Sequence, residues 1–264
     1  MPLITLLTDF GLKDGNVAAM KGVIHNIAPE THLIDISHDI RPQNIPEAAL
    51  ILSRSAPFFP TGTIHLVVVD PGVGTDRRPI GVQLGGQYFI GPDNGVISML
   101  LKLVEASNLK VSFVHLNKPG FWLPQVSDVF HGRDIFAPCA AHLAIGITLD
   151  ELGERITNII RLDFPEPILK KYGYTGEVIH IDHFGNISSN IRFEHLQGKK
   201  VLNVHLCGCE INRIVKTFGE GNQGELVALF GSTGNLIVSV VNGSAAERLQ
   251  ANVGDMFEVF IERG

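Results

Sequence analysis

The hydrophobic pattern of the chain changes once, at residues 162–172, and this change constrains the fold more than any other feature. Before it, apolar runs of strand length alternate with stretches that have helical spacing. After it, short alternating segments are separated by Gly, Asn and Asp. The strands and helices expected before the change are, in chain order, 3–9, 16–27, 32–37, 45–56, 64–70, a hairpin at 79–91, 95–106, 110–116 and 133–145.

The two patterns predict two domains of different class. Residues 1–163 are expected to form an α/β domain with a largely parallel central sheet, because strands alternate with helices of crossover length. Residues 164–172 are expected to be a linker. Residues 173–264 are expected to form an all-β barrel or sandwich.

Composition narrows the class of partner. The 264 residues are 45% hydrophobic and 18% charged, which is enough apolar material for a core. A net charge of −6 without a Lys/Arg-rich run argues against nucleic acid or a membrane surface as partner. No apolar run approaches the roughly 18 residues of a membrane span, and no signal-peptide pattern is present, so a cytoplasmic location is expected.

Three cysteines, Cys139, Cys207 and Cys209, are too few for a disulfide framework and are typical of a reducing compartment. No second cysteine pair or nearby histidine pair completes a metal site around Cys207 and Cys209, so both are expected to be small buried apolar side chains.

Two expected strands end in an aspartate. Asp9 and Asp70 each follow an apolar strand, and Asp14 comes shortly after Asp9. Ligands of parallel sheets bind beyond the carboxyl ends of the strands. An Asp before Pro-Gly, as at Asp70, also commonly begins a turn by bonding its own backbone. Two such residues at one edge favour a binding site there.

No common cofactor or nucleophile motif is present. Gly72-x-Gly74 is not a dinucleotide fingerprint, because Arg77 replaces the third glycine and no helix is expected to begin there. A P-loop, His-Glu-x-x-His and Gly-x-Ser-x-Gly are all missing. Arg77 in its glycine-rich loop, His131 before an apolar helix and the stretch 182–186 between two strands are each also typical of ordinary loops.

Taken together, seven stretches resemble one family in order and along essentially the whole chain. The sequence is similar to the S-adenosylmethionine hydroxide adenosyltransferase family, relatives of bacterial fluorinase and chlorinase. The matching stretches are TDFGLKD (8–14), IDISHDIRPQNIPEAALIL (34–52), VVVDPGVGTDRRP (68–79), IGPDNG (90–95), FHGRDIFAPCAAHLAIG (130–146), IDHFGNISSNI (181–191) and GSTGNLIVSVVNGSAA (231–246).

The resemblance implies hydrolysis of S-adenosyl-L-methionine to adenosine and L-methionine, by attack of hydroxide on C5′. It implies that Asp70, Arg77 and His131 are catalytic. It also implies a homotrimer whose sites lie between subunits, with no cofactor and no metal. The residues implied to bind substrate are Asp9 at the ribose hydroxyls, Asp14 and Asn16 nearby, and Asp182, Phe184, Asn186, Ser232 and Asn242 around the methionine portion and the adenine end.

Elementary chemistry is consistent with this implied reaction. A sulfonium leaves as a neutral thioether, so its departure needs no general acid. Water is a poor nucleophile at neutral pH, and the guanidinium of Arg77 can stabilise hydroxide although it cannot act as a base. Asp70 and His131 can take and relay the proton.

Three alternatives remain open. A halogenase would use chloride or fluoride in the same displacement, but Asp70 would repel a halide, and the halogenating relatives have a non-acidic residue there and a longer insertion than Gly85-Gly86. A non-catalytic adenosine-binding protein would keep the pocket without turnover. A metal-dependent hydrolase would have to use the 11 histidines, which are scattered along the chain.

Overall fold

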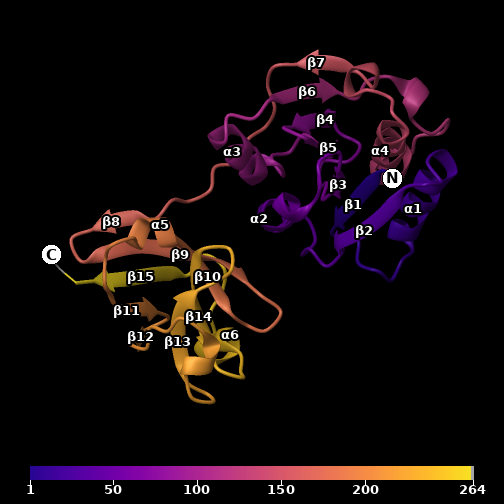
Figure 1. Cartoon of the computed structure of the whole chain (residues 1–264). Helices are drawn as coiled ribbons and strands as arrows, with labels where there is room; N and C mark the ends of the chain where they lie inside the picture. Colours follow the sequence, from indigo (N-terminus) through magenta and orange to yellow (C-terminus); the bar gives the residue numbers. More distant parts are fainter. Residues whose placement is uncertain (263–264) are drawn as a thin grey trace. The chain divides into compact units, whose positions relative to one another are not determined.

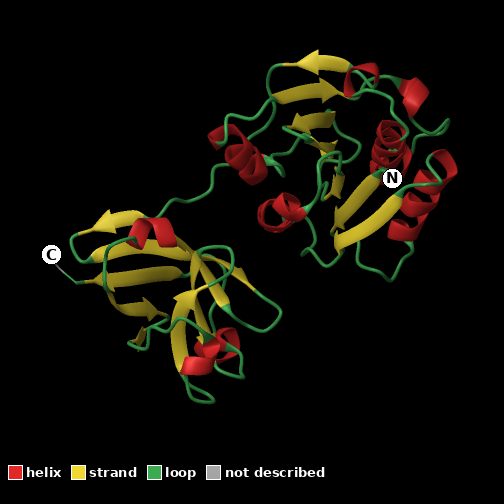
Figure 2. Ribbon diagram, in the orientation of Figure 1, coloured by secondary structure: helices red, strands yellow, loops and turns green. Residues whose placement is uncertain are grey.

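The computed structural model describes residues 1–262, which divide into two compact units, 1–163 and the chain from Phe164 onward (Figure 1). The first unit contains a sheet and most of the helices, and the second is built from strands with two short helices (Figure 2). This confirms the expected fold class, an α/β unit followed by an all-β unit. No helix within residues 1–262 has both the length and the hydrophobicity needed to cross a bilayer.

The first unit is organised around one mixed sheet of seven strands, in the order β2-β1-β3-β5-β4-β6-β7. Strands β2, β1, β3 and β5 are parallel, as expected, whereas β4, β6 and β7 are antiparallel additions. The expected hairpin causes this change, because its short turn at Gly85 and Gly86 reverses the chain between β4 and β5. The strands are β1 (Leu3–Thr8), β2 (His32–Ser37), β3 (Ile64–Val68), β4 (Pro79–Leu84), β5 (Gln87–Pro92), β6 (Val111–His115) and β7 (Glu154–Ile156).

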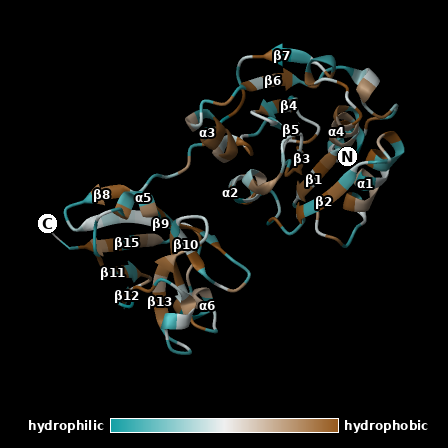
Figure 3. Cartoon of the chain, in the orientation of Figure 1, coloured by the Kyte–Doolittle hydropathy of each residue, from teal (hydrophilic) through white to brown (hydrophobic). Residues whose placement is uncertain are grey.

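Helices cover both faces of this sheet. Along the segment from Leu66, alternate side chains pack into two different apolar cores: Leu66 and Val68 into the core that includes α1 and α4, and Val67 and Val69 into the core that includes α2 and α3. Figure 3 shows the hydrophobic colour concentrated in the central strands. This two-sided burial explains the unbroken apolar run in the sequence. The helices are α1 (Asn16–Ile27), α2 (Ile45–Ser55), α3 (Ser98–Ala106) and α4 (Ala137–Ala144), with 3-10 turns Ala56–Phe58, Pro119–Phe121 and Leu149–Glu151.

The second unit is an antiparallel sheet that nearly closes on itself. Its strand order is β12-β11-β15-β9-β10-β14-β13, with β8 paired to β9. After β12 the chain returns to the other end of the sheet, where Ile214 bridges Ala228 of β13. The elements are β8 (Ile168–Lys170), β9 (Gly173–Ile181), β10 (Ile187–Arg192), α5 (Phe193–Leu196), β11 (Val201–Leu206), β12 (Cys209–Ile211), a 3-10 turn Phe218–Glu220, β13 (Leu226–Phe230), β14 (Asn235–Val240), α6 (Ala245–Leu249) and β15 (Met256–Ile261).

Candidate active site

Asp70 follows the most deeply buried strand of the first sheet. All five residues of β3 are buried. Beside the strand end, the side chain of Asn94 donates a hydrogen bond to the carbonyl of Val69 (2.8 Å). Gly91 of β5 approaches so closely that a Cβ there would overlap the carbonyl oxygen of Val67. Asp70 is therefore carried by a tightly packed and well-bonded strand end.

Arg77 and His131 meet Asp70 at this edge. Arg77 donates from Nε to Oδ1 of Asp70 (3.0 Å) and from Nη2 to Oδ2 (2.5 Å). The same Nη2 lies 3.0 Å from Nδ1 of His131. The side chains of Asp70 and Arg77 are only 5% and 7% exposed. The structure thus brings the three expected catalytic side chains into one connected and largely buried group.

The guanidinium of Arg77 has donors to spare. Its Nη1 is buried and has no hydrogen-bond partner within residues 1–262. The ring of Phe136 lies 5.2 Å from Cζ, where its π face stabilises the positive charge. A buried donor left unpaired costs about 1–3 kcal/mol. Nη1 is therefore suited to bind the oxygen of a small ligand or of water.

The contact with Arg77 fixes the tautomer of His131. Arg77 can only donate, so Nδ1 of His131 accepts and the neutral ring carries its proton on Nε2. Burial and the charge of Arg77 lower the pKa of His131, against the opposing effect of Asp70 and other nearby carboxylates. His131 is therefore a neutral ring at pH 7, and its acceptor nitrogen is already in use.

Asp70 has the properties of a proton acceptor. Burial raises the pKa of Asp70, and the charge and hydrogen bonds of Arg77 offset only part of this effect. A carboxylate has about four lone-pair sites, of which Arg77 uses one on each oxygen. Asp70 thus keeps free acceptor sites and binds a proton more readily than an ordinary aspartate does.

A π-helical turn holds His131. Residues Gly132–Phe136 form this turn, which continues into α4, and such turns are frequent at functional sites. Within it, the fully buried Asp134 accepts from Nε and Nη2 of Arg133 (2.6 and 3.0 Å) and from the backbone N–H of Ser127 (2.8 Å). These bonds tie the preceding loop to the start of the helix.

The loops that carry Arg77 and His131 also contact each other. Gly74 has a φ of +77°, and a Cβ there would lie 2.5 Å from the carbonyl oxygen of Asp128. Only glycine combines this backbone conformation with so close an approach. The glycine-rich loop is therefore pressed against the loop before His131.

Asp9 lies at the same sheet edge as Asp70, because β1 and β3 are parallel neighbours paired in register. Oδ2 of Asp9 accepts from the backbone N–H of Gln43 (2.7 Å), and Oδ1 makes no hydrogen bond within the described chain. Asp14 and Asn16 are exposed where α1 begins. One carboxylate oxygen and two exposed polar side chains are thus available at this end of the edge.

In the second unit, Asp182, Phe184 and Asn186 share the tight turn between β9 and β10. The carboxylate of Asp182 accepts from the backbone N–H groups of Phe184 and Asn186 (2.9 Å each) and from Nδ2 of Asn186 (2.8 Å). The ring of Phe184 is 74% exposed. The backbone of this turn is bonded to the segment after β14, which carries Asn242, so these four expected residues are neighbours.

Ser232 does not join this group. It lies in the turn before β14, whereas Asn242 follows β14. The six residues of β14 span about 20 Å, so Ser232 and the turn 182–186 lie at opposite ends of adjoining strands. Ser232 is therefore not part of the group of expected residues around the turn 182–186.

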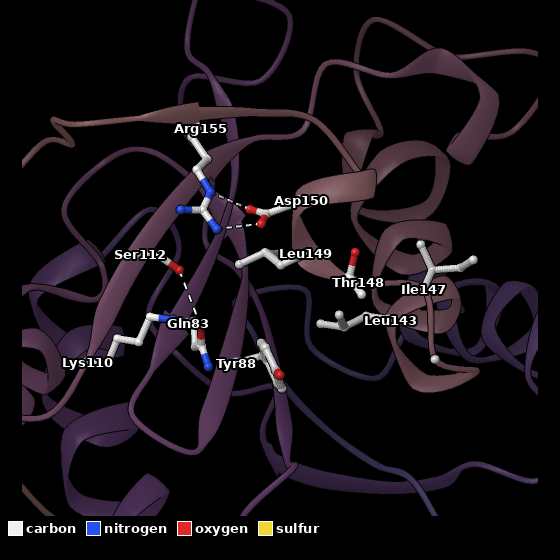
Figure 4. Close-up of a pocket in the computed structure, with 11 residues that line it drawn as sticks. Gln83, Tyr88, Lys110, Ser112, Leu143, Ile147, Thr148, Leu149, Asp150 and Arg155 are labelled. Atoms are coloured by element: carbon white, nitrogen blue, oxygen red, sulfur yellow. Dashed lines mark hydrogen bonds and ion pairs between the residues drawn. The ribbon is translucent and has the colours of Figure 1, made fainter.

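A pocket of about 300 Å³ lies in the first unit, toward the other end of the strands from Asp70 (Figure 4). None of the expected site residues lines it. Arg77 lies two residues before the start of β4, whereas Gln83, which lines the pocket, lies near the end of that strand. Asp150 in the pocket wall is bonded to Arg155 through both carboxylate oxygens (2.8 and 2.5 Å). The length of strand β4 thus separates this pocket from the group of Asp70, Arg77 and His131.

The cysteines differ in part from expectation. Cys139 is buried, and burial raises its pKa to about 12, so it is unreactive. Cys207 and Cys209 are exposed, because Cys207 lies in the turn between β11 and β12 and Cys209 directly follows it. The expectation that both are buried is therefore wrong.

Among residues 1–262, no three His, Cys, Asp or Glu side chains are arranged to bind a metal ion.

Three residues that the sequence did not single out support the site. Asn94 bonds the end of β3, Phe136 packs on the Arg77 guanidinium, and Gln43 bonds Asp9. All three belong to stretches that resemble the family, 34–52, 90–95 and 130–146, and this was the signal that could have found them. Gln43 has a φ of +65°, and this left-handed conformation cannot be predicted from the residue type, because glutamine rarely adopts it.

Comparison with known proteins covers both units. The sequence profile of the SAM hydroxide adenosyltransferase N-terminal domain matches residues 4–153, and that of the C-terminal domain matches residues 176–258. A protein of Salinispora tropica named (R)-S-adenosyl-L-methionine hydrolase is 37% identical, over 98% of this chain and 97% of its own length. A protein of the same name from Thermus thermophilus is 36% identical, over 95% of this chain and 96% of its own length.

The similarity extends to solved structures. The crystal structure of an uncharacterized conserved protein from Thermotoga maritima matches with a TM-score of 0.89 and 36% identity, over 97% of this chain and 99% of that one.

A fluorinase of Nocardia brasiliensis is less similar in sequence: it is 26% identical, over 74% of this chain and 73% of its own length. Hydrolases thus match nearly the whole chain, and this fluorinase matches about three quarters of it.

Proposed function

Because the chain belongs to the S-adenosylmethionine hydroxide adenosyltransferase family, we propose that it hydrolyses S-adenosyl-L-methionine to adenosine and L-methionine. The observation that carries the proposal is the buried group of Asp70, Arg77 and His131 at the sheet edge that also holds Asp9. The enzyme needs no cofactor or metal, and with three free thiols it works in the reducing cytoplasm.

The reaction is a substitution at C5′. The oxygen of water forms a bond to C5′ while the C5′–S bond breaks, and the electron pair of that bond stays on sulfur. The thioether leaves uncharged, so the enzyme supplies no acid for it. The proton of the water passes to Asp70 and from there to solvent, which generates the hydroxide where it reacts.

The three residues have different roles in this step. Arg77 stabilises the developing hydroxide through Nη1, whose N–H groups are not used by the protein. Asp70 accepts the proton, because its raised pKa and free lone pairs suit it to that task. His131 is a positioning group, since its Nδ1 already accepts from Arg77 and holds the guanidinium in place.

The substrate is held from both units. Asp9 binds the ribose hydroxyls through Oδ1, with Asp14 and Asn16 close by in sequence. In the second unit, Phe184 stacks on the adenosyl group, because an exposed ring on a rigid turn is suited to a flat base. Further contacts to the substrate come from Asp182, Asn186 and Asn242 in and beside that turn, and from Ser232 at another part of the ligand.

We propose that the enzyme is a homotrimer and that each site combines the first unit of one subunit with the second unit of its neighbour. Large apolar side chains near the candidate residues are highly exposed in the single chain: Leu12 is 73%, Val129 77% and Phe184 74% exposed. Such side chains beside a polar site favour a contact that covers them.

Subunit mixing tests this assembly. Asp70→Ala carries a defect in the first unit and Asn186→Ala a defect in the second. If sites are shared, mixing and reassembling the two inactive variants should restore activity in about a quarter of the sites, by random assortment in a closed ring. Light scattering gives the subunit number. No regained activity, or a monomer, rejects the shared site.

The reaction itself is tested in water enriched in ¹⁸O. Attack at C5′ puts one ¹⁸O atom into the 5′-hydroxyl of adenosine and none into methionine, which mass spectrometry of the products measures. Absence of product rejects the hydrolase and leaves an adenosine-binding protein. Unlabelled adenosine rejects attack at C5′. Loss of turnover in a chelator would show that a metal takes part.

The halogenase alternative is tested in high chloride. Asp70 is a buried carboxylate beside the position proposed for the nucleophile, and it would repel a halide. We therefore expect adenosine and no 5′-chloro-5′-deoxyadenosine. Appreciable chlorinated product would overturn the assignment.

A further inference from the structure

Two threonines of β1 are each bonded to a buried histidine. Oγ1 of Thr5 lies 2.8 Å from Nδ1 of His65, and Oγ1 of Thr8 lies 2.9 Å from Nδ1 of His38. All four residues are at most 5% exposed. The two pairs are chemically alike, but Thr8 directly precedes Asp9, whereas Thr5 lies about 10 Å further back along the strand.

His38 contacts the Asp9 loop twice. Its side chain meets Thr8, whose Oγ1 in turn accepts from the backbone N–H of Phe10 (3.3 Å). Its backbone carbonyl accepts from the N–H of Gly11 (2.9 Å). The two residues that follow Asp9 are therefore both tied, directly or through Thr8, to His38.

The charged pair of Asp35 and Lys21 lies beside the ring of His38. Nε2 lies 3.1 Å from Oδ1 of Asp35, and Oδ2 of Asp35 accepts from Nζ of Lys21 (2.6 Å). Burial, the largest single effect, raises the pKa of Asp35, but its contacts with Lys21 and His38 together lower it, so Asp35 is an anion at neutral pH. This contact does not have the geometry of a hydrogen bond, but the negative charge of Asp35 favours the tautomer with the ring proton on Nε2, which leaves Nδ1 to accept from Thr8.

The loop needs this support. Gly11 and Gly15 have φ of +62° and +71°, and neither has a heavy atom within 4 Å of the place where a Cβ would lie. Glycine-rich loops in open space lose much conformational freedom when they are ordered. The bond between Asp9 and Gln43 and the edge-to-face packing of Phe10 on Phe130 also hold residues 9–11, and the contacts through His38 bond the backbone of Phe10 and Gly11.

We propose that His38 is a positioning residue of the reaction. From the end of the neighbouring strand β2 it holds residues 9–11 through Thr8 and Gly11, and it thereby orients the carboxylate of Asp9 toward the ribose. The inference rests on the proposed function, because it takes Asp9 to be the ribose ligand.

A matched pair of substitutions tests the proposal. Thr8→Val and Thr5→Val remove the same hydroxyl from the same strand, and each removes one bond to a histidine. Thr8→Val should weaken adenosine binding about tenfold and raise KM, with kcat changed less than about threefold. Thr5→Val should lower Tm but change the dissociation constant less than about twofold. Calorimetry with adenosine and steady-state kinetics measure these values.

Histidine variants give a second, independent reading. His38→Leu should weaken adenosine binding as Thr8→Val does, and His38→Asn should recover part of it, because its amide oxygen replaces Nδ1 as acceptor. In an Asp9→Ala background, Thr8→Val should have no further effect on adenosine affinity. Equal effects of Thr5→Val and Thr8→Val, or a loss that persists without Asp9, would overturn the proposal.

A failure of the proposed function gives a different result. If the unsubstituted protein does not bind adenosine, the ribose role of Asp9 is wrong. The positioning of the loop is then read from amide hydrogen exchange at Phe10 and Gly11. Exchange there should be faster in Thr8→Val than in Thr5→Val, and equal rates would reject the structural link as well.

Discussion

Replacing Asp70 by asparagine removes the proposed proton acceptor at little change in volume. The amide oxygen can still accept from Nε of Arg77, but the amide nitrogen then faces Nη2, which is also a donor. Positioned proton transfer contributes about 10²–10⁴ in rate, so we expect kcat to fall by that factor, about 3–5 kcal/mol in the barrier. The affinity for adenosine should change less than about threefold, because Asp70 is not assigned to the ribose.

Asp76→Asn is the matched control. Asp76 is exposed and directly precedes Arg77 in the same loop, so the same change of charge there should leave kcat within about twofold. Single-turnover release of adenosine, followed by chromatography, separates the chemical step from product release. Calorimetry gives the affinity for adenosine.

A second substitution shows whether the group acts as a unit. His131→Ala should also lower kcat, because it frees one side of the Arg77 guanidinium. Since Asp70 and His131 are joined only through Arg77, the double variant should lose little more than the worse single variant. If Asp70→Asn keeps more than a tenth of kcat, or if the two losses multiply, the assignment of roles is wrong.

Three further predictions concern binding, pH and stability. Asp9→Ala should weaken adenosine binding at least about tenfold in calorimetry, with a smaller effect on kcat. Because the pKa of Asp70 is raised and the reaction needs its carboxylate, kcat/KM should fall as the pH drops through a pKa above 3.8, and Asp70→Asn should lack this limb. Burial lowers the pKa of His65 to about 4, so the unfolded state binds this proton first, and the free energy of unfolding should fall by up to about 3 kcal/mol as the pH drops from 6.5 towards 4. Urea unfolding at both pH values measures this loss, and His65→Leu should reduce it; an unchanged pH dependence would contradict it.

Local pattern predicted much of the first unit. The apolar run 64–70 predicted a strand buried on both faces, and alternate side chains of β3 do pack into two cores. The hairpin at 79–91 was also predictable from its two glycines. Its consequence for the sheet was not, because nothing local says that β5 pairs with β3 and so turns β4, β6 and β7 antiparallel.

The site was only partly readable from the sequence. The position of Asp70 after a strand followed from the pattern, whereas its meeting with Arg77 and His131 depends on tertiary contacts between two loops and was expected only through the resemblance. Exposure of Cys207 was missed, because a cysteine with φ of +49° in a tight turn has no sequence signal. The separation of Ser232 from the turn 182–186 depends on strand register, which local sequence does not specify.

The turn that carries Phe184 is closed by its own chain. Asp182 uses its carboxylate to bond two backbone N–H groups and the amide of Asn186, so the loop has its shape before any ligand arrives. For the proposed docking of the adenosyl group on Phe184, the loop therefore has little main-chain freedom left to lose, and more of the contact energy remains as affinity. Replacing Asp182 would therefore act mainly by making the backbone at Phe184 more mobile. The resulting loss of affinity would be entropic in origin.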